Sequence, residues 1–312
     1  MKTITTILFL LNSCCVILKA GMNQDGVSAG LDLRLLLREK DPGFLCRISN
    51  PHPIDTLQYV ASYDNSYNGF MIYRLDSIDS ARVSGVLLGE VFRVGGDFKP
   101  TVIEVAPGAT HTTVIDLRQF FLDPVFRDVL RGKYNFWRWR VIPWKSKVTA
   151  NESNGICLAF PDAAGNIASP VVDPRSRVAD AILAFIFHEN RPHELGFLFL
   201  NASRQDIGVE KPLAKESKII ATSPAIGYTR ELFIPAVAPE RVVVKAGEVG
   251  EWRIPWPKVL ELIPKEDLER IKKAGGDLDL VWKVGEYESQ PLPLSLADPE
   301  QVQKELGVGA SN

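Results

Sequence analysis

The feature that most constrains how this chain folds is an internal duplication. Residues 105–141 read as a turn, a strand, a short helical stretch, a second turn and a final strand, and residues 244–284 repeat that order. For the turn glycines of the two copies, Gly247 − Gly108 is 139, and the isoleucines of the following strands keep the same offset. A constant offset that changes only in loops indicates two homologous repeats.

The duplication continues on both sides of these stretches. Each copy begins with a hairpin whose second strand ends in asparagine; Asn201 − Asn50 is 151, so the first copy has the longer middle. Trp282 − Trp137 is 145, and the extra residues fall in the longer predicted helix Lys265–Ala274. We therefore align Trp137 with Trp282 in the last strand of each copy.

The strand patterns predict the fold class. Both copies contain short apolar runs separated by turn residues, as in the hairpin around Asp41-Pro42-Gly43. About seven such runs in roughly 120 residues are typical of an immunoglobulin-like sandwich. We predict a mostly β fold of two tandem immunoglobulin-like β-sandwich domains, each with a short helix before its last strand. The expected order is a signal peptide (1–20), a first sandwich (26–148), a linker with one short strand at Ile156–Phe160 (149–176), a second sandwich (177–297) and a C-terminal tail (298–312).

The N-terminus has the layout of a secretory signal peptide. Lys2 precedes an apolar run at residues 4–18, and small residues follow at Ala20 and Gly21. This layout predicts cleavage near Ala20 and a secreted or periplasmic protein. Because the run is shorter than the roughly 20 residues that a membrane-spanning helix needs, we expect no membrane insertion after cleavage. The alternative is a true start at Met22, which would make the protein cytoplasmic.

Two cysteines and two sequons leave alternatives open. Cys46 and Cys157 remain after signal cleavage and could form a disulfide, or Cys46 could be a small buried hydrophobe in its apolar strand. Asn151-Glu-Ser and Asn201-Ala-Ser fit the glycosylation sequon, which matters only in an exported eukaryotic protein. The formal net charge of −2 gives no electrostatic reason to expect nucleic acid as a partner.

Motifs for metal binding and catalysis are incomplete. His188 and His193 are spaced i, i+5 with Pro192 between them, whereas a zincin helix needs i, i+4. Residues 64–69 match the first half of a calcium loop, but the twelfth position, where the bidentate Glu belongs, is Leu75. No serine lies in a nucleophile elbow. We therefore predict no metal, no cofactor and no catalytic residue.

Aromatic and basic residues suggest one candidate ligand surface. The last strand of the first copy reads Phe-Trp-Arg-Trp-Arg, and period-two geometry puts its tryptophans on one face and its arginines on the other. Aromatic strands form cores more often than surfaces, so a buried tryptophan face is the competing interpretation. The candidate surface residues are Tyr63, Tyr67, Trp137, Arg138, Trp139 and Arg140.

The repeated motifs resemble those of known sandwich domains. A strand-end asparagine, a Val-x-Pro-Gly turn, an Ile-Asp-Leu strand and a Gly-x-Tyr strand recur at Asn50, 105–108, 114–117, 132–134, Asn201 and 246–247. Together they are similar to the N-terminal β-domain of deuterolysin-type metallopeptidases and to BsuPI-like intracellular proteinase inhibitors. The resemblance implies a sandwich fold and a link to peptidases. It carries over no catalytic residue, because the zinc helix of the peptidases is absent.

These observations lead to three functional hypotheses. We expect a non-enzymatic exported binding or scaffold protein with an unknown protein or glycan partner. The alternatives are a peptidase inhibitor or detached peptidase pro-domain, and a carbohydrate-binding module. An ordered loop at residues 74–93 would favour inhibition, aromatic side chains exposed on a concave face would favour sugar binding, and two buried tryptophans would favour the scaffold.

Overall fold

The computed structural model gives a mostly β protein, which confirms the predicted fold class. It describes residues 32–39, 43–60, 68–74, 77–79, 82–84, 102–118, 127–128, 130–141, 151–172, 179–235 and 240–298. The expected signal peptide, almost all of the expected tail, and Tyr63 and Tyr67 lie outside these residues. Within the described chain, no helix is both long and apolar enough to span a bilayer.

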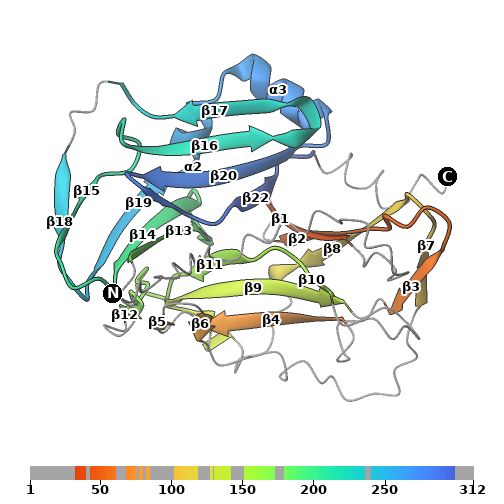
Figure 1. Ribbon diagram of the computed structural model, residues 1–312, viewed down its shortest axis with the longest axis horizontal. Coiled ribbons are helices and arrows are strands. Elements are labelled where there is room, and N and C mark those ends of the chain that lie inside the picture. Colours follow the sequence, from red (N-terminus) through yellow and green to blue (C-terminus); the bar gives the residue numbers. More distant parts are fainter. Residues whose placement is uncertain are drawn as a thin grey trace, which may run out of the picture.

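Two large sheets dominate the fold (Figure 1). Sheet 1 has the order β17 (Tyr228–Leu232), β16 (Ser217–Ser223), β20 (Asp277–Val284), β22 (Leu292–Ser295), β1 (Asp32–Arg38), β2 (Gly43–Ser49) and β8 (Thr110–Asp116), with β21 (Tyr287–Glu288) on β20. Sheet 2 has the order β10 (Asn151–Glu152), β9 (Lys133–Val141), β11 (Ile156–Phe160), β13 (Ala179–Ile186), β14 (Glu194–Asn201) and β19 (Val249–Pro255), with β4 (Asn68–Arg74) also on β9.

Smaller elements flank the two sheets. The short ribbons are β3 (Leu57–Val60) with β7 (Val102–Val105), β15 (Ile207–Glu210) with β18 (Arg241–Val244), and β12 (Val171–Val172) with β5 (Ser77–Asp79) and β6 (Arg82–Ser84). The second repeat also carries η2 (Pro224–Ile226), α2 (Trp256–Leu260) and α3 (Lys265–Lys273). The predicted helix before the last strand is thus present as α3, whereas most of its first-repeat counterpart lies outside the described residues.

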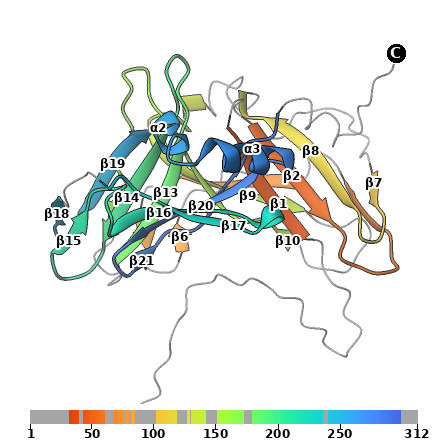
Figure 2. The same cartoon turned by 90° about the horizontal axis from the view of Figure 1, so that it is seen from above.

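Both sheets are built from both repeats. We call residues 32–172 the first half and residues 179–298 the second half. Sheet 1 joins β1, β2 and β8 of the first half to β22, β20 and β16 of the second, and sheet 2 joins β13, β14 and β19 to β11, β9 and β4. Seen from above, β1, β2 and β8 lie on one side of the molecule and β13, β14 and β19 on the other (Figure 2). Each half therefore contributes one set of strands to each layer.

Two strands make the connections between the halves, and we call β11 and β22 the junction strands. β22 pairs antiparallel with β20 and parallel with β1, where Leu294 lies opposite Leu37. β11 pairs antiparallel with β9 and parallel with β13, where Leu158 lies opposite Phe185. The same pairing, in the same register, thus occurs once in each sheet. It relates the two halves by approximate two-fold symmetry.

β11 lies inside the segment predicted to be a linker. Ile156–Phe160 is the one short strand expected there, and all five of its residues are buried. Its sequence is continuously apolar because both faces of this interior strand are covered. Neither sheet shows a break between the predicted domains at 26–148 and 177–297. The division into two separate domains stays a prediction.

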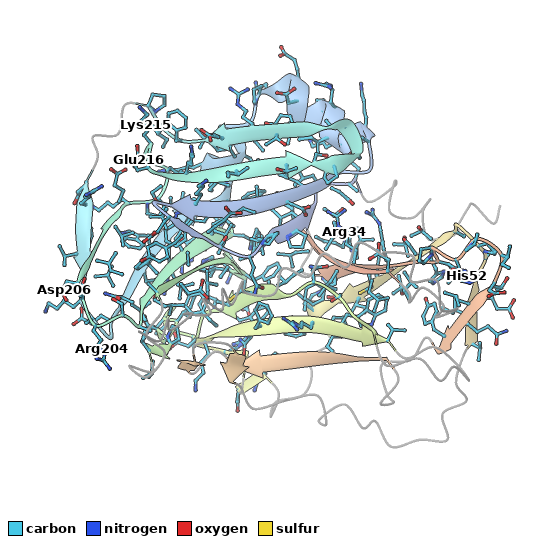
Figure 3. All side chains as sticks on the ribbon, viewed as in Figure 1. Arg34, His52, Arg204, Asp206, Lys215 and Glu216 are labelled. Atoms are coloured by element: carbon cyan, nitrogen blue, oxygen red, sulfur yellow. The ribbon has the colours of Figure 1, made fainter. Side chains whose placement is uncertain are left out.

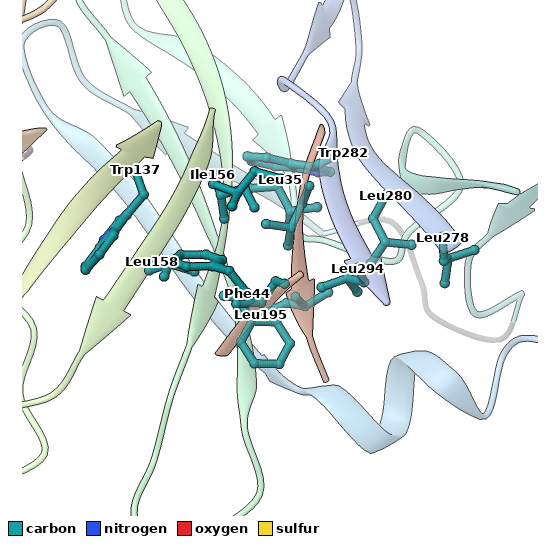
Figure 4. Close-up of a cluster of buried hydrophobic side chains, with 14 of the residues drawn as sticks. Leu35, Phe44, Trp137, Ile156, Leu158, Leu195, Leu278, Leu280, Trp282 and Leu294 are labelled. Atoms are coloured by element: carbon teal, nitrogen blue, oxygen red, sulfur yellow. The ribbon is translucent and has the colours of Figure 1, made fainter. Parts of the chain in front are cut away.

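One hydrophobic core runs through both halves (Figure 4). In the first half Phe44 stacks on Phe70 at 5.4 Å between ring centroids and contacts Trp137 at 5.5 Å. In the second half Phe197 meets Trp282 edge to face at 5.3 Å. Each of these contacts joins a strand of one sheet to a strand of the other. The inward faces of the two layers therefore form a sandwich core.

The structure corrects the alignment of the tryptophans. Trp139 donates its backbone N–H to Ser153 Oγ at 2.9 Å, and Ser153 N–H donates to Trp139 O at 2.8 Å. Trp282 and Ser289 repeat both hydrogen bonds, at 2.9 and 2.8 Å. Trp282 is therefore the equivalent of Trp139, two residues beyond the predicted Trp137.

Candidate functional site

Of the six predicted ligand-surface residues, the structure describes the side chains of Trp137, Arg138 and Trp139, and these three do not share one face of β9. Trp137 and Trp139 are 0% and 4% exposed and belong to the sandwich core. Arg138 points to the opposite face of β9, as the alternation predicted, and its guanidinium lies 5.5 Å from the centre of the Phe136 ring. The side chains of Arg140, Tyr63 and Tyr67 lie outside what the structure describes. The two tryptophan rings are therefore closed to a ligand in this structure.

The repeated strand-end asparagines form the chain's most regular polar motif. Asn50 donates both amide hydrogens, to Val105 O at 2.9 Å and Asp55 O at 2.8 Å, and its Oδ1 accepts from His52 N–H at 2.9 Å. Gly108, at φ +69°, donates its N–H to Asn50 O at 2.9 Å. The asparagine thus fixes the turn that leads from the flanking ribbon into β8.

Asn201 makes the equivalent contacts in the second half. Its amide donates to Val244 O at 2.8 Å and Gln205 O at 2.9 Å, and its backbone O accepts from Gly247 N–H at 2.7 Å. The side chain is fully buried. Both hydrogens of the amide that a glycan would need are already donated, so Asn201 is not an accessible glycosylation site in the folded chain.

The two cysteines are free and lie in different layers of the protein. Cys46 points from β2 into the sandwich core, whereas Cys157 belongs to a separate cluster on the outer face of sheet 2. Burial raises the pKa of both thiols, which favours the unreactive neutral form. The disulfide that the sequence left open is absent from this structure.

A charged network crosses from one half to the other on the outer face of sheet 1. Arg34 on β1 binds Asp279 on β20 at 2.9 Å and Asp277 at 3.4 Å (Figure 3 labels Arg34). Arg47 on β2 lies directly opposite Arg34 and binds the same Asp277 oxygen at 2.5 Å. Burial raises the pKa of Asp279, and Arg34 opposes this effect. The negative charges of the two carboxylates offset the repulsion between the two adjacent guanidinium groups.

A shallow hollow lies beside this network. It has a volume of about 480 Å³ and is lined by Arg47, Thr110, Thr112, Ala274, Gly275 and Asp277. Its walls come from β2 and β8 of the first half and from the end of α3 and β20 of the second. Asp277 Oδ1 is buried in its wall with no hydrogen-bond partner. A second hollow, lined by Ser203, Arg204, Gln205, Ile207 and Tyr287, lies wholly in the second half.

A second polar network joins the halves on the outer face of sheet 2. Tyr134 on β9 donates its hydroxyl to Glu251 Oε1 on β19 at 2.8 Å, and Ser169 donates to the other carboxylate oxygen at 2.9 Å. Arg253 Nε also donates to Glu251 Oε1, at 2.7 Å. Burial, then the Glu251 charge, raises the pKa of Tyr134, so the phenol stays a donor. Gly196 leaves room for this hydroxyl, because an added Cβ would lie 3.3 Å from it.

The turn between β13 and β14 contains the only histidine cluster that the sequence singled out. His188, whose side chain is 4% exposed, lies 2.8 Å from Glu194 Oε2 through Nε2. Arg191 Nε donates to His188 Nδ1 at 2.9 Å. The backbone N–H of His188 donates to His193 Nδ1 at 3.2 Å. Burial and the nearby His188 lower the pKa of His193.

This turn, residues 187–193, also contacts the first half. Glu189 binds Arg131 at 2.5 Å. Phe187 stacks on Phe160 of β11 at 5.6 Å, and its backbone N–H donates to Ala159 O at 3.0 Å. We call residues 187–193 the histidine hairpin. Within the described residues, no three His, Cys, Asp or Glu side chains group closely enough to hold a metal ion.

Sequence reasoning found the histidine hairpin but not the two networks that cross between the halves. The hairpin is one continuous stretch of polar residues in an otherwise apolar pattern. Arg34 and Asp279, in contrast, are 245 positions apart, and nothing in the local pattern relates them. The sequence does show charged residues on the polar face of these strands. Such residues are also expected at ordinary surface positions, so they do not reveal the networks.

Comparisons with known proteins give no family. No protein-family model matches the chain, and no curated protein matches it. Among solved structures, the chain is similar to the crystal structure of red sea bream transglutaminase, with 7% identity and a TM-score of 0.24. The match covers 86% of this chain and 31% of that one. A similarity this distant carries no argument about fold or activity.

Proposed function

We propose that this chain is a non-enzymatic exported binding or scaffold protein whose two sandwiches act as one rigid frame. The supporting observation is where its buried polar groups are used. Asn50 and Asn201 fix equivalent turns, and the networks around Asp277 and Glu251 tie one half to the other. Buried polar groups that are fully hydrogen-bonded make a structure rigid and specify one arrangement, and the two asparagine amides and both Glu251 oxygens meet this condition.

A rigid frame of this kind suits a protein that presents surfaces at fixed positions. Parallel strand pairing at both junctions resists sliding, since a one-residue slip would move every side chain of the junction strand to the opposite face, which is also packed. Loops and ribbons at the two ends then keep a constant separation. A partner that contacts both halves would recognise that separation, whether the partner is a protein or a glycan.

The peptidase-inhibitor and carbohydrate hypotheses have less support. Most of the loop at residues 74–93, where an inhibitor would present its reactive segment, lies outside the described residues. The carbohydrate hypothesis relied partly on Trp137 and Trp139, whose rings are in the core. Export stays part of the proposal. N-terminal sequencing of the mature protein tests it, and a mature chain beginning at Met22 would contradict it.

The scaffold proposal can be tested by separating the halves after folding. A protease site inserted within residues 173–178 allows the folded full-length chain to be cut between β12 and β13. We first isolate a partner by chemical crosslinking in the producing cells and reconstitute the pair from purified proteins. We then compare binding by intact chain, by cut chain, and by cut chain whose halves have been separated in denaturant.

The expected result is stoichiometric binding by the intact and cut chains and loss of binding by either separated half. The matched control is the uncut insertion variant carried through the same denaturant step and refolded. Equal binding by one separated half would contradict the role of the joined frame. Turnover of a substrate by the purified chain would contradict the non-enzymatic assignment.

A further inference from the structure

We propose that the histidine hairpin is an acid-responsive contact between the two halves, controlled by a proton on Nδ1 of His188. The proposal rests on which atoms of the hairpin donate and which accept. It concerns residues 187–193 and the first-half segment that they touch, and it does not depend on the identity of a partner.

The hydrogen bonds fix the protonation state of His188. An arginine guanidinium stays protonated under all ordinary conditions, so Arg191 Nε can only donate. His188 Nδ1, 2.9 Å from that nitrogen, must therefore be the acceptor and carry no proton. The single imidazole proton then lies on Nε2 and is donated to Glu194 Oε2 at 2.8 Å. The neutral Nε2–H tautomer is the one this geometry accommodates.

A second proton on His188 would remove the Arg191 contact. The new N–H would point at another N–H, with two positive groups at hydrogen-bond distance. Glu194 would still stabilise the imidazolium through Nε2, so the ring would remain in place. Acid is therefore expected to displace Arg191 rather than to unfold the sheet.

The charged groups around the ring come from three elements. Glu194 belongs to β14, Arg191 and Glu189 belong to the hairpin itself, and Arg131 precedes β9 in the first half. His193 adds a second neutral imidazole whose Nδ1 accepts the backbone N–H of His188. A proton on that nitrogen would break this bond as well. Burial lowers the pKa of His193 and so opposes its protonation on mild acidification, and the proposal therefore assigns the response to His188.

Displacement of Arg191 would be felt in the first half. The Arg191 guanidinium lies over Gly165, since a Cβ added there would be 3.6 Å from its Nη2. Gly165 belongs to the turn that begins at Asp162, which accepts hydrogen bonds from two backbone N–H groups of its own loop. The Arg131–Glu189 pair and the Phe160–Phe187 stack would then hold the hairpin without Arg191.

The first half has no counterpart of this device. Its equivalent turn joins β1 to β2 through residues 39–42 only, and none of them is a histidine. The second half therefore has three more residues at this position, and its hairpin carries His188, Arg191 and His193. Histidine is the side chain whose charge ordinarily changes between about pH 5 and pH 8. An added titratable turn placed against the other half is suited to sense that range.

The test compares full-length wild type with His188→Gln by amide hydrogen exchange at about pH 7.5 and about pH 5, with rates corrected for the intrinsic effect of pH. Glutamine can donate to Glu194 and accept from Arg191 but does not titrate in this range. His52→Gln is the matched control. His52 also accepts a backbone N–H through Nδ1, from Asp55 at 2.9 Å, but it lies in a first-half loop.

We expect protection of residues 187–193 and 162–166 to fall about tenfold on acidification in wild type and in His52→Gln. In His188→Gln it should stay constant. An equal fall in His188→Gln, or constant protection in wild type, would overturn the proposal. Imidazole nitrogen NMR of wild type gives a second test that needs no variant. A proton found on Nδ1 of His188 at about pH 7.5 would also overturn it.

Discussion

The two halves of this protein share a framework and differ in what decorates it. Asn50 and Asn201 make matching hydrogen bonds, including those from the turn glycines Gly108 and Gly247. The junction strands are paired in the same register in both halves. The hairpin at 187–193 has no equal in the first half. Shared features are those that the sandwich needs in order to close. Features confined to one half are therefore the better places to look for function.

The junction strands give the strongest way to break this comparison. Leu158 on β11 and Leu294 on β22 are equivalent and fully buried. Replacing either by alanine should lower the free energy of unfolding by about 3 kcal/mol, from lost burial and the cavity left behind. Because each strand joins both halves, both variants should shift a single denaturant transition.

Ile54→Ala is the control for these variants, since that side chain is 78% exposed. Its effect should stay within about 0.5 kcal/mol. Two separate transitions in either leucine variant would show that the halves unfold independently, and the shared core would then not couple them.

The strand-end asparagines give the next largest effect. Asn50→Ala and Asn201→Ala should each lower the free energy of unfolding by about 2 kcal/mol, because one buried and one partly buried carbonyl lose their donor. Equal costs are expected, since the two side chains make matching bonds. Asn→Asp is the companion variant: it keeps the shape but cannot donate, so it should be no more stable than alanine. Costs that differ by more than about 1 kcal/mol would break the equivalence.

The serine–tryptophan pairs sharpen the corrected alignment. Ser153→Ala and Ser289→Ala each remove the hydroxyl that accepts the buried backbone N–H of a tryptophan. Each substitution should therefore lower the free energy of unfolding by about 1 kcal/mol. Equal losses in chemical denaturation would support matching Trp139 with Trp282. Thr112→Val serves as the control, because it removes a hydroxyl of similar burial outside both pairs. A loss at Ser153 without one at Ser289 would contradict the prediction that the two pairs stabilise the protein equally.

The comparison also explains what the sequence could reveal. The strand-end asparagines and turn glycines were predictable because they recur at matching places in the two copies, and α3 was predictable because its apolar spacing is a local pattern. The tryptophan match was wrong by two residues, and a two-residue slip in a strand leaves every side chain on its original face. Trp137 and Trp139 are both buried, so hydrophobic pattern alone does not distinguish them.

The pairing of the junction strands could not be predicted from local sequence pattern, for a different reason. β1 and β22 are paired through residues more than 250 positions apart, and their apolar sequences would suit any interior strand. The segment around β11 looked like a linker because its flanks are rich in Pro, Asn and Asp. All five residues of the strand are buried, so its apolar side chains outweighed the polar flanks and placed it between two sheet edges.

The smallest expected effect concerns Asp279 on β20, which pairs with Arg34 on β1 of the other half. Burial raises its pKa in the folded chain, and Arg34 only partly offsets this. The unfolded chain therefore releases the proton first as pH rises above about 4, so ionised Asp279 disfavours folding at neutral pH and this penalty disappears on acidification. Asp279→Asn should remove that pH dependence. At neutral pH its effect should be below about 1 kcal/mol, because the lost penalty and the lost Arg34 contact oppose each other.

The measurement is the denaturant midpoint of wild type and variant at several pH values between about 4 and 7. The difference between the two should narrow or reverse as pH falls, since protonated aspartate and asparagine carry the same charge. Glu231→Gln is the matched control, because its partner Lys218 lies within the second half and the pair does not cross between the halves. A constant difference across the range would mean that burial and the Arg34 contact cancel, which contradicts the prediction. Wild type that gains stability over the variant as pH rises would mean that the Arg34 contact outweighs burial. The network on sheet 1 would then be a source of stability in addition to fixing how the halves meet.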